Sequence, residues 1–179
     1  MDLGFDIVDL PETDHPTAGE TAPDFTRPLV TDEYWEDVSL SSLLGDEPLL
    51  LVCYPMDGAF PATYIWNELR ERDFADTFEL TIAGLSISTP YEHTTFIEER
   101  GIDVPLFSDP ANGVAEQYDI VNDLDGMTGI AEPRPAVFLI DTDQTVQYAW
   151  VADEWPAFPP YDELEDALAT HCDMKPLES

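Results

Sequence analysis

Basic residues are scarce in this chain. Of its 179 residues only 6 are lysine or arginine, and Lys175 is the only lysine, whereas 39 are aspartate or glutamate, which gives a formal net charge of −33. Proteins that bind nucleic acids need clustered Lys and Arg to contact phosphates, and anionic membranes attract the same residues. The sequence therefore predicts neither a nucleic acid nor a membrane as a partner.

Cysteines and long apolar runs are also few. Cys53 and Cys172 are the only cysteines, too few for a disulfide framework and too widely separated for a metal motif, so we expect no metal and no cofactor. The longest apolar run, Pro48 to Pro55, is too short to span a bilayer. The N-terminus lacks the basic segment and apolar core of a secretory signal. These features favour a reducing, cytoplasmic location.

The acidic excess predicts how the chain responds to salt. A net charge of −33 makes the compact state repel itself, and molar salt screens that repulsion because the Debye length falls to about 3 Å. We therefore expect a cytoplasmic protein of a salt-accumulating halophile. The alternative interpretation is an acidic surface for a basic partner.

Enough apolar residues remain for a folded core, since hydrophobic residues make up 44% of the chain and aromatic residues 11%. Short apolar runs alternate with helical patterns, which is typical of an α/β domain with helices covering a central sheet. We predict a flexible acidic extension over residues 1–18, one domain over 19–170 and a tail over 171–179.

Several elements can be predicted from local patterns. The continuous apolar run Leu49–Tyr54 predicts a central strand buried on both faces. A helix is expected from Pro90 to Arg100, with Thr89 as its N-cap and Gly101 ending it. The remaining predictions are strands at 80–88 and 104–107, helices at 63–74, 111–118 and 161–170, and a hairpin of strands 136–141 and 145–151 at or near the end of the sheet.

Four stretches resemble the peroxiredoxin family, also called the alkyl hydroperoxide reductase/thiol-specific antioxidant group. They read GETAPDF at 19–25, VSLSSLLGDEPLLLVCYP at 38–55, IAGLSISTPYEHTTFIEERGIDVPLFSDPANGVAEQYDI at 82–120 and PAVFLIDTDQTV at 135–146. The resemblance implies a thioredoxin-like, peroxiredoxin-type fold with a central mixed sheet flanked by helices. It also implies an antioxidant activity, peroxide reduction with electrons from a thioredoxin-like reductant, and self-association.

The loop that carries this chemistry in the family is altered here. The family motif has a proline, three residues, a threonine, two residues and the reactive cysteine, and PMDGAFPA places Pro55, Ala59 and Ala62 at the three named positions. Arg134 stands one residue before the position of the family's second arginine, which Pro135 occupies. Hydroxyl and thiol are both missing, so we expect a binding, regulatory or oligomer-partner module without direct cysteine peroxidase activity.

The alternative hypothesis is an active thiol peroxidase that uses Cys172 or Cys53. Cys53 lies within a predicted strand, and a buried, inert cysteine is the simpler interpretation. Cys172 follows the last predicted helix, where we expect an exposed tail thiol. His171 and Lys175 lie near it in sequence and would lower its pKa if they were also close in space.

Other polar and aromatic residues give weaker indications of function. His93 is expected on a solvated helix face rather than at a metal. The segment 122–132 half resembles a calcium loop, through Asp123, Asp125, Gly126 and Glu132, but Val121 stands at the first ligand position, so an acidic connector is the better interpretation. Aromatic and methionine side chains near the altered loop would either pack in the core or line a small apolar cleft: Tyr54, Met56, Phe60, Tyr64 and Trp66.

The charge predicts that stability depends on salt. We expect the urea midpoint of unfolding to rise between 0.05 M and 1 M KCl, roughly the range over which the Debye length shortens to about 3 Å. Titrating urea at several KCl concentrations measures this, and neutral sucrose, which favours burial without screening charge, is the control. A urea midpoint that does not change with KCl would show that charge repulsion does not limit the stability of the folded state.

Overall fold

Strand β4 (Leu49–Cys53) lies inside a seven-stranded mixed sheet, between parallel β5 (Thr81–Ser86) and antiparallel β9 (Ala136–Ile140). All five of its residues are buried. Successive side chains of a strand point to opposite faces, so a strand that is apolar throughout requires cover on both sides. The prediction of a doubly buried central strand is confirmed, one residue shorter than expected.

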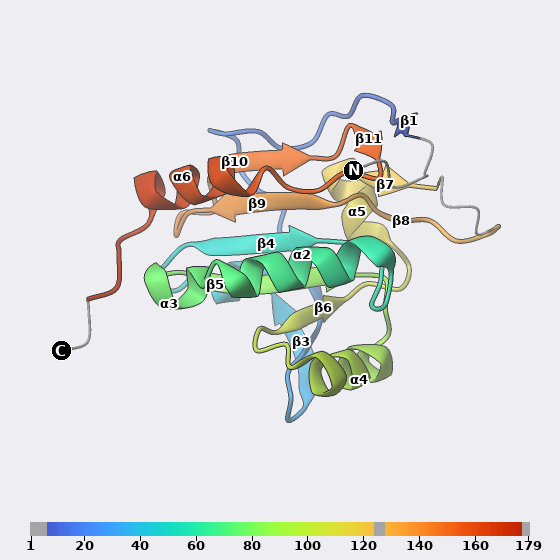
Figure 1. Cartoon of the computed structure of the whole chain (residues 1–179), viewed down its shortest axis with the longest axis horizontal. Coiled ribbons are helices and arrows are strands. Elements are labelled where there is room, and N and C mark those ends of the chain that lie inside the picture. Colours follow the sequence, from blue (N-terminus) through green and yellow to red (C-terminus); the bar gives the residue numbers. More distant parts are fainter. Residues whose placement is uncertain (1–6, 124–127, 177–179) are drawn as a thin grey trace.

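The computed structural model describes residues 7–123 and 128–176, and the strand order of the main sheet is β10-β9-β4-β5-β6-β2-β3 (Figure 1). The hairpin β9–β10 puts β10 at an edge of this sheet, as predicted. The other strands of the main sheet are β10 (Val146–Val151), β6 (Leu106–Ser108), β2 (Thr26–Val30) and β3 (Trp35–Ser39). Two small ribbons pair β1 (Val8–Asp9) with β11 (Glu154–Trp155), and β7 (Val121–Asn122) with β8 (Glu132–Pro133).

Helices cover both faces of the sheet, and Figure 1 shows α2 lying along β4 and β5, with α6 beside β9 and β10. Leu50 and Val52 of β4 pack in a core with side chains of α2, α4 and α6, whereas Leu49 and Leu51 pack with α1 and α5. Within the described residues, no helix is long and apolar enough to cross a membrane. The helices are α1 (Leu40–Leu43), α2 (Phe60–Glu71), α3 (Phe74–Thr77), α4 (Pro90–Arg100), α5 (Gly113–Tyr118) and α6 (Tyr161–His171).

Helix α4 has the predicted ends. The Thr89 side chain accepts a hydrogen bond from the backbone N–H of Glu92, and the Glu92 carboxylate accepts one from the backbone N–H of Thr89. Gly101 adopts a left-handed conformation after the last turn. The helix predicted at 63–74 was wrong at both ends. It begins at Phe60, because a proline is tolerated in the first turn of a helix, and it ends before the left-handed Asp73, after which the short α3 begins.

Parts of both predicted terminal segments contact the domain. Within the predicted extension, Val8 pairs with Trp155, and the side chain of Leu10 is buried. At the other end, Met174 forms a bridge with Phe78. The expected domain boundaries, at residues 18 and 170, stay predictions.

Gly84 of β5 leaves no room for a side chain beside Trp66 of α2. A Cβ atom built there would lie 2.7 Å from Cζ2 of Trp66 and 2.6 Å from Cδ2 of Leu106, both in the buried core. We expect Gly84→Ala to lower the free energy of unfolding by about 1–3 kcal/mol through overpacking. Urea unfolding in molar KCl measures the loss. Gly45→Ala is the matched control, since nothing lies within 4 Å of its built Cβ, and equal stability of the two variants would contradict the prediction.

Candidate functional site

The loop of residues 55–59 connects the end of β4 to the start of α2. Ala59 is the N-cap of α2 and its side chain makes no capping hydrogen bond, and Ala62 lies in the first turn of the helix. The Ala62 methyl is fully buried in the core between the sheet and α2. The free N–H groups of a helix N-terminus carry partial positive charge, which stabilises an anion such as a thiolate. The start of α2 therefore supplies a positive potential that would stabilise an anion, but the side chain of Ala62 cannot ionise.

Cys53 is the last residue of β4 and is fully buried. It packs in the core on the α1 and α5 side of the sheet, whereas Ala62 packs on the other side. Burial raises the pKa of the Cys53 thiol far above its ordinary value, and the nearby carboxylate of Asp109 raises it further. The prediction that Cys53 is a buried cysteine is confirmed, and its raised pKa disfavours the thiolate needed for attack on a peroxide.

Cys172 is also buried, so the expectation of an exposed tail thiol was wrong. It follows α6 and keeps 7% of its surface exposed, because the chain after the helix turns back along α3 and packs against the core. Burial raises its pKa to about 11, and Asp141, Asp173 and Glu47 contribute further. The Nζ atom of Lys175 instead donates a hydrogen bond to the carbonyl oxygen of Ala75.

The Arg134 side chain is buried and bound to the backbone. Its Nε donates to the carbonyl oxygen of Val121 at 3.3 Å and its Nη1 to that of Ala152 at 3.2 Å, and burial lowers the pKa of the guanidinium. Other basic side chains are engaged elsewhere: Arg27 pairs with Asp109, Arg72 with Glu68 and Asp162, and Arg70 with the carbonyls of Arg100 and Gly101. These contacts hold the cations within the fold.

A buried polar network fastens the loop, and sequence reasoning missed it. Asp57 Oδ2 lies 2.6 Å from Nδ1 of His93, and the phenol of Tyr54 donates to Asp57 Oδ1 at 2.7 Å. The Asp57 backbone N–H donates to Ser88 Oγ at 2.8 Å, and Nε2 of His93 lies 2.9 Å from the carbonyl oxygen of Phe107. His93 is fully buried, so its predicted place on a solvated helix face was wrong. Its partner Asp57 is 36 residues earlier, which is why no local pattern indicates the pair.

The aromatic side chains near the loop separate into a buried pair and a cluster at the surface, in which Phe158 is half-buried. Tyr54 and Trp66 are buried and meet edge to face, with ring centroids 5.7 Å apart, so core packing is confirmed for these two. Phe60 and Tyr64 are exposed on the first turns of α2. Their ring centroids lie 5.8 and 5.9 Å, respectively, from that of Phe158. Met56, in the loop itself, is half-buried.

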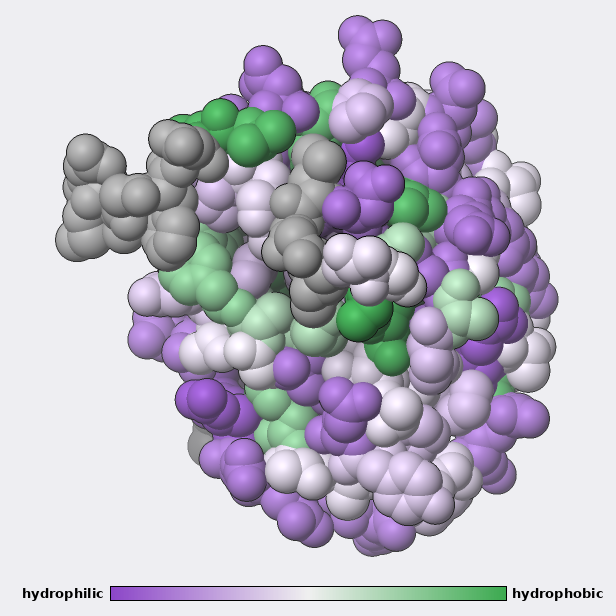
Figure 2. Space-filling view, turned by 90° about the vertical axis from the view of Figure 1, so that its right-hand side faces the viewer, coloured by the Kyte–Doolittle hydropathy of each residue, from purple (hydrophilic) through white to green (hydrophobic). Residues whose placement is uncertain are grey.

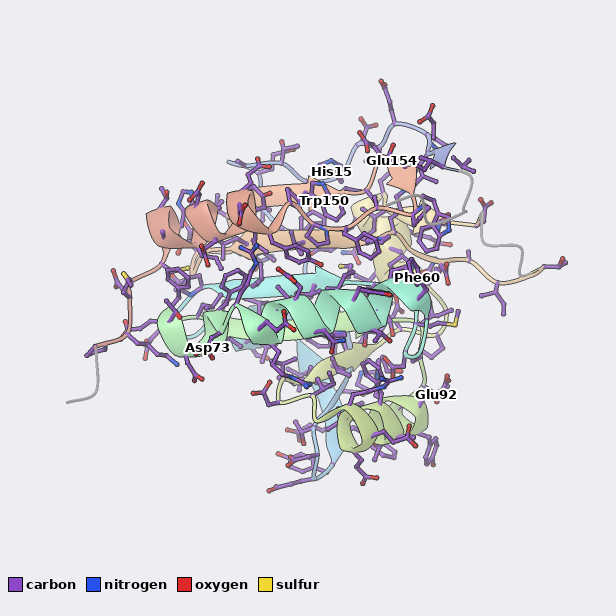
Figure 3. All side chains as sticks on the ribbon, in the orientation of Figure 1. His15, Phe60, Asp73, Glu92, Trp150 and Glu154 are labelled. Carbon is purple, nitrogen blue, oxygen red and sulfur yellow. The ribbon has the colours of Figure 1, made fainter. Side chains whose placement is uncertain are left out.

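Figure 3 shows Phe60 at the same end of the molecule as Glu92 in the first turn of α4. Viewed from that end, the surface in Figure 2 carries apolar side chains set among hydrophilic ones. The starts of α2 and α4 and the loop between β4 and α2 therefore share one side of the domain.

The predicted connector at 122–132 is described only in part, since Asp125 and Gly126 lie outside the described residues. Asn122 and Glu132 pair across β7 and β8, and both are buried. Over residues 7–123 and 128–176, no three His, Cys, Asp or Glu side chains gather closely enough to hold a metal ion.

The chain is similar to known proteins over most of its length. The sequence pattern of the AhpC/TSA family matches residues 18–149. A Synechocystis protein named as a peroxiredoxin is 31% identical over 142 residues, which cover 74% of this chain and 68% of that protein. The chloroplastic 2-Cys peroxiredoxin of Hordeum vulgare is 25% identical over 149 residues, covering 78% of this chain and 68% of its own length.

Solved structures agree. The peroxidoxin BcpB of Mycobacterium tuberculosis superposes with a TM-score of 0.70 at 29% identity, covering 87% of this chain and 96% of the other. The thiol peroxidase from Chromobacterium violaceum is 21% identical and superposes with a TM-score of 0.73, covering 88% of this chain and 89% of that protein. This superposition shows that the two chains share a fold. The predicted thioredoxin-like, peroxiredoxin-type fold is confirmed, and the chain belongs to the AhpC/TSA family of peroxiredoxins.

Proposed function

We propose that this member of the family has lost direct cysteine peroxidase chemistry, with Ala62 at the position of the reactive cysteine. The observation that carries the proposal is the first turn of α2, where a buried methyl group lies at a helix N-terminus suited to a thiolate. Peroxide reduction by cysteine requires a thiolate sulfur that attacks one peroxide oxygen, breaks the O–O bond and becomes a sulfenic acid. Ala62 cannot perform this step, and Ala59 offers no hydroxyl to orient a peroxide.

The two thiols of the chain are poor replacements. Cys53 and Cys172 are both buried, and burial raises the pKa of each. Neither therefore meets the usual requirement of a reactive cysteine, a lowered pKa in an accessible position. These observations weigh against the alternative of a thiol peroxidase that uses either residue.

The function proposed in its place is a binding, regulatory or oligomer-partner role on a retained scaffold. Folds commonly keep their architecture while the chemistry of a site changes. The cluster that Phe60 and Tyr64 of α2 form with half-buried Phe158 supports this proposal, because Phe60 and Tyr64 are exposed and exposed aromatic side chains are typical of interfaces. Self-association and a location in the cytoplasm of a salt-accumulating cell are part of the proposal.

Peroxide consumption tests the loss of chemistry. In molar KCl with a thiol reductant, we expect the purified protein to consume hydrogen peroxide no faster than the Cys53→Ser, Cys172→Ser double variant. Sulfenic acid trapping with mass spectrometry locates any oxidised sulfur. Rapid consumption with modification at Cys172 or Cys53 would instead establish the thiol peroxidase and name its nucleophile.

Restoring a sulfur tests the retained setting. Because a helix N-terminus lowers the pKa of a thiol, we expect Ala62→Cys to consume peroxide on the order of tenfold faster than the unmodified protein and to form a sulfenic acid at residue 62. Ala169→Cys is the control, since it adds a thiol at an exposed position near the C-terminal end of α6. A folded Ala62→Cys protein no more reactive than this control would contradict a retained peroxidase geometry.

A further inference from the structure

The contact between Asp57 and His93 requires a shared proton. The carbonyl oxygen of Phe107 can only accept a hydrogen bond, so Nε2 of His93 carries a hydrogen. Nδ1 lies 2.6 Å from Asp57 Oδ2, a separation that needs one hydrogen between the two atoms. Whether nitrogen or oxygen holds it, the two side chains together keep one proton in this contact.

This contact is buried and joins the loop to the body of the domain. The His93 side chain is fully buried and the Asp57 side chain is 6% exposed. Asp57 also accepts a hydrogen bond from Tyr54 at the end of β4, and its backbone N–H donates to Ser88 before α4. Through one aspartate, the loop is thus tied to β4, to α4 and, by way of His93, to the backbone of β6.

The other charged groups around the pair are occupied. Burial and Asp57 raise the pKa of Tyr54 well above its ordinary value, so the phenol stays a neutral donor. On α4 itself, Glu92 accepts from the Thr89 backbone N–H at 3.1 Å. From β2 and the end of β6, Arg27 and Asp109 face each other in an ion pair at 2.8 Å. The acidic residues of β3, the outer neighbour of β2, are exposed to solvent: Glu36 and Asp37.

We propose that Asp57 and His93 form a proton-dependent latch that holds the loop of residues 55–59 in place. A second proton, gained in acid, neutralises Asp57 and leaves a buried imidazolium without its counterion. Loss of the shared proton, in alkali, places a nitrogen lone pair against a carboxylate. A buried imidazolium without its counterion and a buried carboxylate that faces a lone pair both raise the free energy of the folded loop. In either state the loop is therefore released, and the N-cap of α2 at Ala59 moves with it. The latch goes beyond the proposed function, since it needs neither a thiol nor a peroxide.

Amide hydrogen exchange tests the latch at its own residues. The N–H of Asp57 is bonded to Ser88, and that of Ala59 to the carbonyl oxygen of Met56. We compare the exchange of these two amides in the unmodified protein and in His93→Gln at the same pH, so that the intrinsic pH dependence of exchange cancels. His171→Gln is the matched control, because His171 is exposed at the end of α6.

At neutral pH we expect exchange at Asp57 and Ala59 to be on the order of tenfold faster in His93→Gln, the effect of leaving a buried polar group without its partner, and unchanged in His171→Gln. The advantage of the unmodified protein should disappear toward acid and alkaline pH. Equal exchange in all three proteins at neutral pH would overturn the proposal.

A second measurement needs no variant and decides the matter if His93→Gln does not fold. Nitrogen-15 NMR of labelled histidine follows the protons on His93 in the unmodified protein as the pH changes. We expect the change in its protonation to coincide with the loss of amide protection at Asp57. A change in protonation that leaves this protection intact would show that the pair does not latch the loop. Because the assays contain no peroxide, their failure is independent of any failure of the proposed function.

Discussion

Burial of β4 on both faces is the constraint on which the rest of this structure depends. Its side chains alternate between two cores, so helices must cover each side of the sheet, and its last residue sets where the loop to α2 begins. Pairing with β5 and β9 fixes its register. The start of α2 and the buried position of Ala62 follow from this arrangement.

The chain has few basic side chains, and most of them are held by contacts within the fold. The side chains of Arg27 and Arg72 pair with carboxylates, whereas those of Arg70, Arg134 and Lys175 bind backbone carbonyls. In a chain with 39 acidic residues, these contacts engage five of the six basic side chains. The site at the start of α2 thus retains the dipole of the helix as a source of positive potential, while Arg134 is directed to the backbone.

Buried hydrogen bonds hold the loop of residues 55–59 in place. An uncapped helix start with a small side chain in its first turn would leave the loop weakly fixed, but Asp57 anchors it through His93, Tyr54 and Ser88. The loop is thereby kept in an ordered form beside the aromatic cluster of Phe60, Tyr64 and Phe158. Order of this kind suits recognition, because a preformed surface loses less conformational entropy on binding.

Local patterns in the sequence determined most of the architecture. The apolar run of β4, the capping box of α4 and the β9–β10 hairpin each depend on residues close together in the chain, so periodicity and capping rules were sufficient to predict them. The sequence alone likewise shows that residues 55–62 contain no cysteine. Tertiary structure alone decided the Asp57–His93 contact, the burial of Cys172 and the pairing of Val8 with Trp155. Each of these joins segments far apart in sequence, and no local rule specifies which distant side chain will fill the space beside a buried group.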